Sequence, residues 1–289
     1  MLPRRQLLQL AFTGAALAGA AHSAPAVAAH QPLDLGLRSA QDDLLIWAKL
    51  KADLSGRTVY AVTTGTVWGF KPQADDLPLV DFSRRLYGYR SCVARQARLN
   101  KDGTVSIKSR SWNFYLDAGS GQFVTELLNP YTGKTVKSAP MIGPAAVQNY
   151  STAGLLDFKP AYPVEQLTPS RPFDLHISVV NDHAFVTESS FIRLKPGNIS
   201  WWKLEGTMTS HSCQLRDLRE GSRTHTPSSW SQNLVAEWQT WMEMHGTPGH
   251  ILFKGDGCPV YSAAELPPEL QRDIESVSPG GLADINKWS

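Results

Sequence analysis

The sequence predicts a mainly β fold, an antiparallel barrel-like or strongly curved sheet with an N-terminal and a C-terminal packing helix. Three observations support this class. Runs of alternating residues rich in Val, Thr, Phe and Trp are separated by Gly, Pro and Asn turn signals. Two pairs of these runs are close enough in sequence to form hairpins. Helix-start signals occur before the first run and after the last one.

Residues 1–29 predict an export signal. They contain Arg4-Arg5, an apolar run from Leu7 to Ala21 and a small-residue segment at Ala26-Val27-Ala28. The apolar run is too short to span a bilayer, so we expect no stable membrane insertion of the mature chain. The arginine pair resembles a twin-arginine signal, with a general secretory signal as the alternative. Both alternatives predict a periplasmic or secreted protein.

Residues 30–289 are predicted to form a single mainly-β domain. This length supports one sizeable core, and the sequence has no internal repeat or low-complexity linker. Residues 1–29 hold two of the 28 basic residues, so the remainder has 26 basic and 26 acidic residues. A chain without an excess of basic residues has no surplus positive charge to neutralise the phosphates of a nucleic acid, so we expect no nucleic-acid partner. We expect a small-molecule partner instead. The oligomeric state does not follow from the sequence.

The two packing helices are predicted from their first turns. Ser39-Ala40-Gln41-Asp42 places an N-cap before an acidic third position, and the apolar spacing continues to Leu54. Ser262-Ala263-Ala264-Glu265 repeats this pattern ahead of Leu270 and Ile274. We expect the second helix to plug or brace one end of the sheet.

A first hairpin is predicted for Tyr87–Leu99 and Thr104–Leu116. The intervening Asn100-Lys101-Asp102-Gly103 is a strong hairpin-turn signal. It sets a register whose inward pairs are Leu99 with Val105, Ala97 with Ile107, Arg95 with Ser109, Val93 with Ser111, Ser91 with Asn113 and Tyr89 with Tyr115. This face changes from apolar to polar and aromatic, which indicates either a pocket mouth or ordinary tyrosine packing.

A second hairpin is predicted for His183–Leu194 and Ser200–Cys213, joined by a tight turn at Lys195-Pro196-Gly197-Asn198. This turn places Phe185, Phe191 and Met208 on one apolar face, which we expect to be core. The other face carries Lys203 and two opposed pairs of ionisable residues. These pairs are Glu188 with Glu205 and Asp182 with His211.

The Glu188 and Glu205 pair is the main candidate for acid–base chemistry. Opposed residues on a ladder have Cβ atoms about 5 Å apart. Without water, one of two carboxyls at this distance would have a raised pKa. The face that carries them either looks at solvent or lines a ligand cavity, because Val, Ile, Trp and Thr accompany the charges.

The segment Ser138–Pro172 is rich in proline and small residues, and we expect a long ordered loop that covers a site. Cys92, Cys213 and Cys258 permit one disulfide at most, with a pairing that the sequence does not determine. The sequence contains no phosphate-binding loop, dinucleotide fingerprint or nucleophile elbow, and its His and Cys residues lack zinc-type spacing. We therefore expect no cofactor and no metal.

Four stretches resemble a known bacterial family, the domain of unknown function 1838. They are the segment from Leu50 to Gly69, Tyr115-Leu116-Asp117, Asn129-Pro130-x-Thr-Gly133, and Trp241-Met242 through Gly249-His250. The resemblance covers nearly the whole chain after residue 29. It implies a single full-length domain and an exported setting, and it brings no activity or catalytic residues.

Two functional hypotheses follow. In the first, the protein is a cofactor-independent lyase, isomerase or hydrolase that acts on a small aromatic, terpenoid or sugar-derived molecule. Glu188 and Glu205 would share a proton, and Asp182 would orient His211. In the second, it is a periplasmic protein that binds a similar molecule without changing it. The predicted binding residues are Tyr89, Asn113, Tyr115, Trp201 and Thr207.

Overall fold

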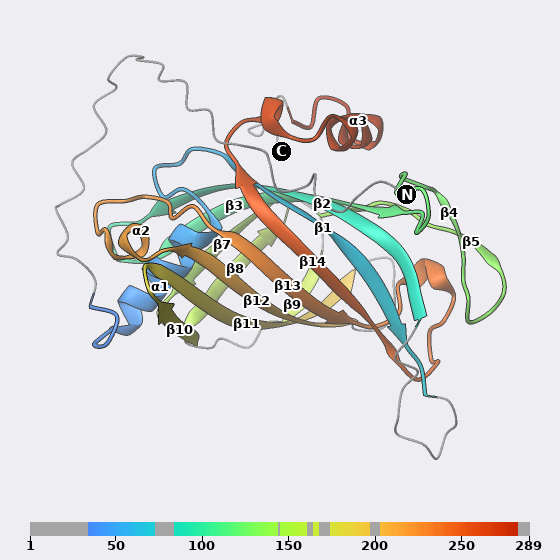
Figure 1. The fold of residues 1–289 in the computed structure, drawn as a ribbon, viewed down its shortest axis with the longest axis horizontal. Coiled ribbons are helices and arrows are strands. Elements are labelled where there is room, and N and C mark those ends of the chain that lie inside the picture. The colour runs from blue at the N-terminus through green and yellow to red at the C-terminus, as the bar shows by residue number, and fades with distance from the viewer. Residues whose placement is uncertain are drawn as a thin grey trace.

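The fold is built around one large antiparallel sheet (Figure 1). The computed structural model describes residues 34–72, 84–143, 145–160, 164–167, 174–196 and 203–282. The sheet strands are β1 (Val59–Phe70), β2 (Arg84–Leu99), β3 (Val105–Leu116), β6 (Met141–Ile142), β7 (Ala146–Ser151), β8 (Gly154–Pro160), β9 (Val164–Leu167), β10 (Leu175–Val180), β11 (His183–Pro196), β12 (Lys203–Gln214), β13 (Ser229–Ala236) and β14 (His250–Val260). The predicted signal at residues 1–29 lies outside the described residues.

The smaller elements surround this sheet. They are the helices α1 (Ala40–Lys51), α2 (Leu215–Arg219) and α3 (Pro268–Val277), the short turns of helix η1 (Thr240–Met242) and η2 (Ala263–Glu265), and the two-stranded sheet of β4 (Glu126–Leu128) and β5 (Thr135–Lys137). The strand order of the main sheet is β10-β11-β12-β13-β14-β1-β2-β3-β7-β8. The mainly β, antiparallel class is confirmed. In the described residues the sheet curves strongly but is not closed into a barrel, because β8 and β10 do not pair.

Helix α1 lies against the concave face of the sheet. The predicted capping box is present, since the Ser39 hydroxyl accepts from the Asp42 N–H and the Asp42 carboxylate accepts from the Ser39 N–H. One side of the helix packs through Leu44 and Ala48 on β2 and β3, and another packs through Ile46 on β10, β11 and β12. The helix therefore connects the two arms of the curved sheet.

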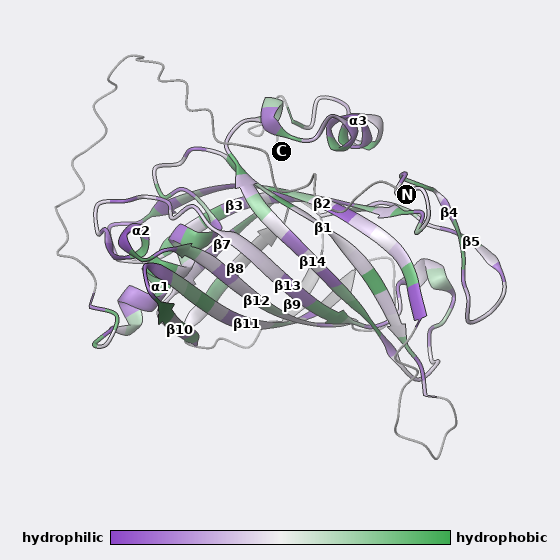
Figure 2. Cartoon of the chain, in the orientation of Figure 1, coloured by the Kyte–Doolittle hydropathy of each residue, from purple (hydrophilic) through white to green (hydrophobic). Residues whose placement is uncertain are grey.

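Helix α3 covers the outer face of β2 and β3, so it braces a face and does not plug an end. Its Leu270 and Ile274 are fully buried against Trp112 and Phe114. Arg90 on β2 forms an ion pair with Asp273 of the helix, in which Arg90 Nη2 lies 2.6 Å from Asp273 Oδ2. Figure 2 shows the alternation of hydrophobic and hydrophilic residues along the strands that creates these two faces.

A second apolar cluster lies on the concave face at the end away from α1. Trp238, Met242 and Met244 fold back after β13 and pack on inward residues of β1, β2 and β14. The buried Asn129 side chain donates to the Met242 carbonyl at 2.8 Å.

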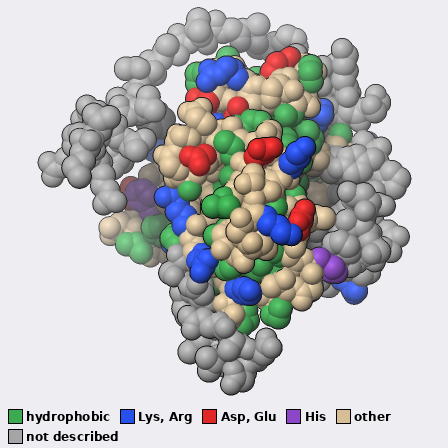
Figure 3. Space-filling view, turned by 90° about the vertical axis from the view of Figure 1, so that its right-hand side faces the viewer, with side chains coloured by type: hydrophobic (Ala, Val, Ile, Leu, Met, Phe, Trp, Pro, Cys, Tyr) green, Lys and Arg blue, Asp and Glu red, His purple; other side chains and the backbone are tan. Residues whose placement is uncertain are grey.

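On the side of the molecule shown in Figure 3, basic and acidic side chains are interspersed with hydrophobic ones.

The first hairpin has the predicted register. Leu99 pairs with Val105, Arg95 with Ser109, and Tyr89 with Tyr115.

The prediction of a long loop at Ser138–Pro172 is wrong for the described residues of that segment. The strands β7 and β8 form a hairpin that extends the sheet beside β3, because residues 146–151 and 154–160 pair along their length.

The second hairpin has a different register from the predicted one. Pro196 does not form a tight turn, because it pairs with Val164 of β9 and stays extended. The strands are offset by four residues, so Glu188 pairs with Thr209 and Glu205 pairs with Ile192. Asp182 lies at an exposed turn, and its carboxylate contacts the neighbouring His183 at 2.9 Å. The predicted Glu188–Glu205 and Asp182–His211 pairs are therefore wrong.

The predicted core face of this hairpin is also wrong. Phe185, Phe191 and Met208 are 40%, 38% and 50% exposed on the outer face. The opposite face holds Ala184 and Val186, which are fully buried under α1. These smaller side chains allow the helix to approach the sheet closely, so the ionisable face is the inward one.

Three glycines shape the concave face. Trp230 lies across Gly257, where an added Cβ would be 2.4 Å from the indole ring. Tyr89 lies across Gly65 and Gly255, where added Cβ atoms would be 2.8 Å and 2.2 Å from its ring and hydroxyl. Two aromatic side chains can lie flat on the strands because these positions have no side chain.

Gly257→Ala should destabilise the fold by about 2 kcal/mol, because the new methyl group overlaps Trp230 and the Val62 carbonyl oxygen. Urea unfolding measures this change. Gly206→Ala on β12 is the matched control, since nothing lies within 4 Å of its Cβ position. We expect its effect to stay within about 0.5 kcal/mol. Equal losses in the two variants would contradict the proposed role of Gly257.

Candidate functional site

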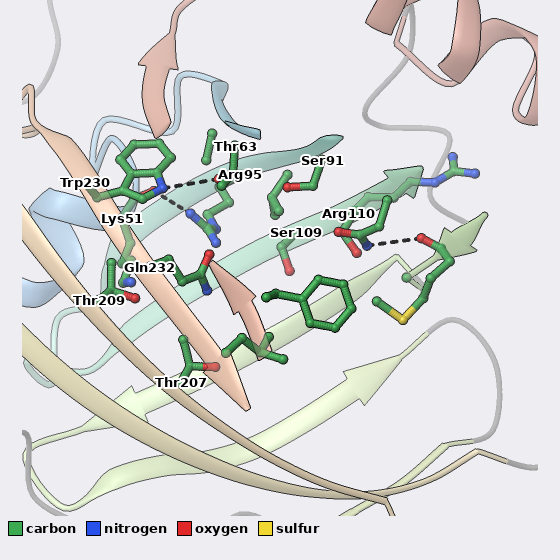
Figure 4. Close-up of a pocket in the computed structure, with 18 of the residues that line it drawn as sticks. Lys51, Thr63, Ser91, Arg95, Ser109, Arg110, Thr207, Thr209, Trp230 and Gln232 are labelled. Carbon is green, nitrogen blue, oxygen red and sulfur yellow. Dashed lines mark hydrogen bonds between the residues drawn. The ribbon is translucent and has the colours of Figure 1, made fainter. Parts of the chain in front are cut away.

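A cavity of about 580 Å³ lies on the concave face of the sheet. Its wall comes from β1, β2, β3, β6, β7, β12, β13 and β14, with the end of α1 at one side (Figure 4). Apolar side chains such as Val93, Leu234 and Phe253 form much of the lining. Polar side chains lie between them and come from Ser, Thr, Asn, Gln, Tyr and His and from four charged residues, Lys51, Arg95, Arg110 and Glu205. This volume and chemistry are typical of sites for small molecules.

The floor of the cavity is held by aromatic side chains. The Trp230 N–H donates to the Thr63 hydroxyl at 3.2 Å, which fixes the indole across Gly257 (Figure 4). Tyr89 packs edge-on against Phe253, with ring centroids 5.2 Å apart. The floor is therefore shaped by contacts within the protein.

A cluster of four ionisable residues, Lys51, Arg95, Glu188 and His211, lies at the α1 end of the cavity. We call it the charged cluster. Lys51 comes from the last turn of α1 and forms an ion pair with Glu188 of β11. His211 Nε2 lies 3.6 Å from the same Glu188 carboxylate, and His211 Nδ1 lies 3.2 Å from the Ser228 hydroxyl. Lys51, Arg95 and His211 line the cavity, and Glu188 lies behind them.

Electrostatics fix the protonation of this cluster. Burial raises the pKa of Glu188, but the charge of Lys51 and the hydrogen-bond donor of His211 outweigh burial and bring the pKa to about 2. Burial lowers the pKa of Lys51 and of His211, and in both cases Glu188 opposes this effect. Glu188 is thus ionised and His211 neutral at pH 7. We assign the His211 proton to Nε2, because it faces the carboxylate.

Arg95 extends this cluster from β2. Its guanidinium is half-buried, and burial lowers its pKa. Within the described residues its hydrogen bonding is limited to a 3.5 Å contact with the Lys51 carbonyl oxygen, and no carboxylate forms an ion pair with it. Figure 4 shows Arg95 directed into the cavity.

Glu205 lines the far end of the cavity. It is six residues from His211 along β12, or about 20 Å in an extended strand. Its charge adds to burial in raising the pKa of Tyr115. Tyr115 is buried between Tyr87 and Trp241, with ring centroids 5.1 Å and 5.0 Å away. The two glutamates therefore belong to different ends of one cavity and cannot share a proton.

The predicted binding residues separate into three groups. Tyr89, Asn113 and Thr207 line the cavity. Tyr115 is instead part of the aromatic cluster beside it, which matches the tyrosine-packing alternative. Trp201 lies outside the described residues. Among the predicted acid–base residues, Glu188 and His211 come together and Asp182 does not join them.

Sequence reasoning did not select Lys51, Arg95, Trp230 or Gln232, all of which line the cavity. A signal existed for Arg95, because the predicted register already placed it on the inward face opposite Ser109. No signal existed for Lys51. Its ion pair with Glu188 joins residues from distant parts of the chain, and only the packing of α1 brings them together.

Comparison with protein-family models identifies the family of this chain. Residues 56–281 match the family described as protein of unknown function (DUF1838). The chain belongs to this family. A search of the curated proteins found no match. The part of the chain that matches DUF1838 includes Arg95, Glu188 and His211, whereas Lys51 precedes it. Membership in DUF1838 brings no activity to the cavity.

Other kinds of site have no basis in the described residues. No group of three or more His, Cys, Asp and Glu side chains is arranged to hold a metal ion in them. Cys92, Cys213 and Cys258 are all free thiols, and the predicted possibility of one disulfide is not realised. None of the described helices has the length and apolar character that crossing a membrane requires.

Glu188→Gln should remove a stabilisation that depends on pH. The folded-state pKa of about 2 lies below the ordinary 4.5, so the ionised group stabilises the fold above pH 4.5 and loses this effect as pH falls toward 2. Above pH 5 we expect wild type to be about 3 kcal/mol more stable than Glu188→Gln. By about pH 3 the difference should fall to less than half.

Urea unfolding at a series of pH values measures this difference. Glu126→Gln on β4 is the matched control, because Glu126 is exposed and lies outside the charged cluster. We expect its effect to stay within about 0.5 kcal/mol throughout. A Glu188→Gln difference that does not change with pH would contradict the assigned ion pair.

Proposed function

We propose that this chain binds a small, largely apolar molecule in the cavity of its curved sheet. The observation that carries this proposal is the cavity of about 580 Å³, lined by apolar and aromatic side chains with polar groups between them. A space of this size is far larger than the voids left by normal core packing. The glycines under Trp230 and Tyr89 keep it open at the cost of strand propensity.

The geometry favours binding over the glutamate-pair mechanism. Glu188 is engaged by Lys51, and the four-residue offset separates it from Glu205. Both ring nitrogens of His211 face protein groups, Ser228 on one side and Glu188 on the other. A general base must reach the proton that it removes. Glu188 does not line the cavity, and His211 Nδ1, the nitrogen without a proton, lies at the Ser228 hydroxyl.

A cofactor-independent lyase, isomerase or hydrolase is the second candidate. It is favoured by one observation, the buried His211 Nε2 that makes no hydrogen bond and lies 3.6 Å from Glu188. In this candidate His211 accepts a proton from a bound molecule at Nδ1, its unprotonated nitrogen, and the Glu188 carboxylate beside Nε2–H stabilises the resulting imidazolium. Asp182 has no part in it, because its carboxylate is exposed at a turn.

Export completes the proposal. Arg4-Arg5 and the short apolar run that follows support passage of the chain to the periplasm or the exterior. The ligand would then be a molecule available outside the cytoplasm. Detection of a shortened chain in the periplasm by N-terminal sequencing, with retention of an Arg4→Lys/Arg5→Lys variant in the cytoplasm, tests this part.

Binding is tested with Nile red, an uncharged dye that fluoresces in apolar surroundings. Thr207→Trp should weaken dye binding at least tenfold, because the new side chain enters the cavity from β12. Met208→Trp is the matched control, since residue 208 is the next one along the strand and points outward. Wild type and Met208→Trp should bind alike in a fluorescence titration.

The converse result would overturn the proposal. If Met208→Trp changes the titration and Thr207→Trp does not, the dye binds the exposed outer face of β11 and β12. The enzyme candidate is tested on compounds that displace the dye. Mass spectrometry should recover them unchanged if the protein only binds them, whereas conversion by wild type and not by His211→Gln would favour the enzyme.

A further inference from the structure

We infer that the ligand carries a carboxylate group that Arg95 binds at the α1 end of the cavity. This inference rests on the proposed binding function and adds the chemical class of the ligand. It is based on the charged cluster, in which cations outnumber carboxylates. Lys51 and Arg95 supply two cations, whereas Glu188 supplies one carboxylate and already forms an ion pair with Lys51.

The second cation has no partner of opposite charge among the described residues. Among the described residues the guanidinium of Arg95 donates a hydrogen bond only to the Lys51 carbonyl oxygen, at 3.5 Å, which leaves most of its five donors without an acceptor there. It is also half-buried and lines the cavity. A desolvated charge without a counter-charge is costly, so a site that retains one is prepared for an anion.

The surroundings of Arg95 compensate its charge in part, because Glu188, which forms its ion pair with Lys51, also acts on Arg95 electrostatically. His211 is the nearest titratable group of β12 in the cluster, and it is buried and neutral. Glu205, the carboxylate on the cavity wall, belongs to the far end of β12. The α1 end of the cavity therefore carries a net charge of one positive unit.

This single charge selects a carboxylate over a phosphate monoester. A planar guanidinium binds a carboxylate through two parallel hydrogen bonds, and one negative charge balances the cluster. A phosphate near neutral pH carries close to two charges and would leave one unbalanced. The apolar wall formed by Val93, Leu234 and Phe253 then receives the rest of the molecule.

The ligand is thus an organic monocarboxylate with an apolar or aromatic body. Its carboxylate lies at Arg95, and its body extends over Trp230 toward the end of the cavity that Glu205 lines.

Matched acids and amides test this inference. Naphthoate with naphthamide, and dodecanoate with dodecanamide, compete against Nile red and are also measured by calorimetry. In wild type, the acid of at least one pair should bind about tenfold more tightly than its amide, because a charge-assisted pair replaces a neutral contact. Arg95→Met should abolish this preference and leave amide affinity within about twofold.

Two further variants complete the design. Arg98→Met is the matched control, because Arg98 is exposed on the outer face of the same strand, and it should keep the preference. Arg95→Lys keeps the charge and loses the paired hydrogen bonds, so it should retain part of the preference. It also serves as the test variant if Arg95→Met does not fold, as judged by circular dichroism.

The outcomes separate the two proposals. If Nile red enters the cavity but acids and amides bind equally in wild type, the carboxylate inference is overturned and the binding function stands. The same holds if Arg95→Lys and Arg95→Met both keep the full acid preference. If neither the dye nor any member of the pairs binds, both proposals are wrong.

Discussion

The structure depends on one helix that lies across the concave face of a curved sheet. Its Leu44 and Ala48 pack on one arm of the sheet, and its Ile46 packs on the other. The burial of these residues links strands that make no hydrogen bonds to each other in the described chain. The apolar contacts of α1 thus hold the two arms of the sheet together, whereas hydrogen bonds between the first and last strands do so in a barrel.

The same helix sets the electrostatics of the cavity. Lys51 is in its last turn, where a cation is favourable to the helix dipole, and this position brings the ammonium group to Glu188. Burial of the pair at the cavity wall requires that both charges stay matched. The charge of Arg95 is the surplus that remains. Apolar packing by the helix and the position of the Lys51–Glu188 ion pair are therefore two results of one placement.

The sequence predicted the local parts of this arrangement. The β2–β3 register followed from Asn100–Gly103, because a short turn fixes the pairing of the strands that it joins. The β11–β12 register did not follow, since Pro196 pairs with a third strand that the turn signal does not reveal. The observed register differs from the predicted one by four residues, and a shift by an even number leaves each residue on its predicted face of the sheet. Glu188 and His211 were therefore predicted correctly to share a face.

The choice of the inward face needed information from elsewhere in the chain. Aromatic residues such as Phe185 and Phe191 favour a core, yet α1 packs on the face with Ala184 and Val186. The helix that decides between the two faces is far away in sequence. For the same reason the partner of Glu188 could not be identified as Lys51 before the fold was known.

The pairing of β1 with β14 constrains when the protein can fold. Tyr60 pairs with Val260, so two strands near opposite ends of the described chain are neighbours at the centre of the sheet. Contacts of such long sequence separation form late and slowly. During synthesis, the central pairing must wait until β14 has left the ribosome, and earlier strands expose their edges until then. A chain that crosses a membrane already folded would complete this step inside the cell, whereas a chain threaded through unfolded would complete it only after its last strand arrives.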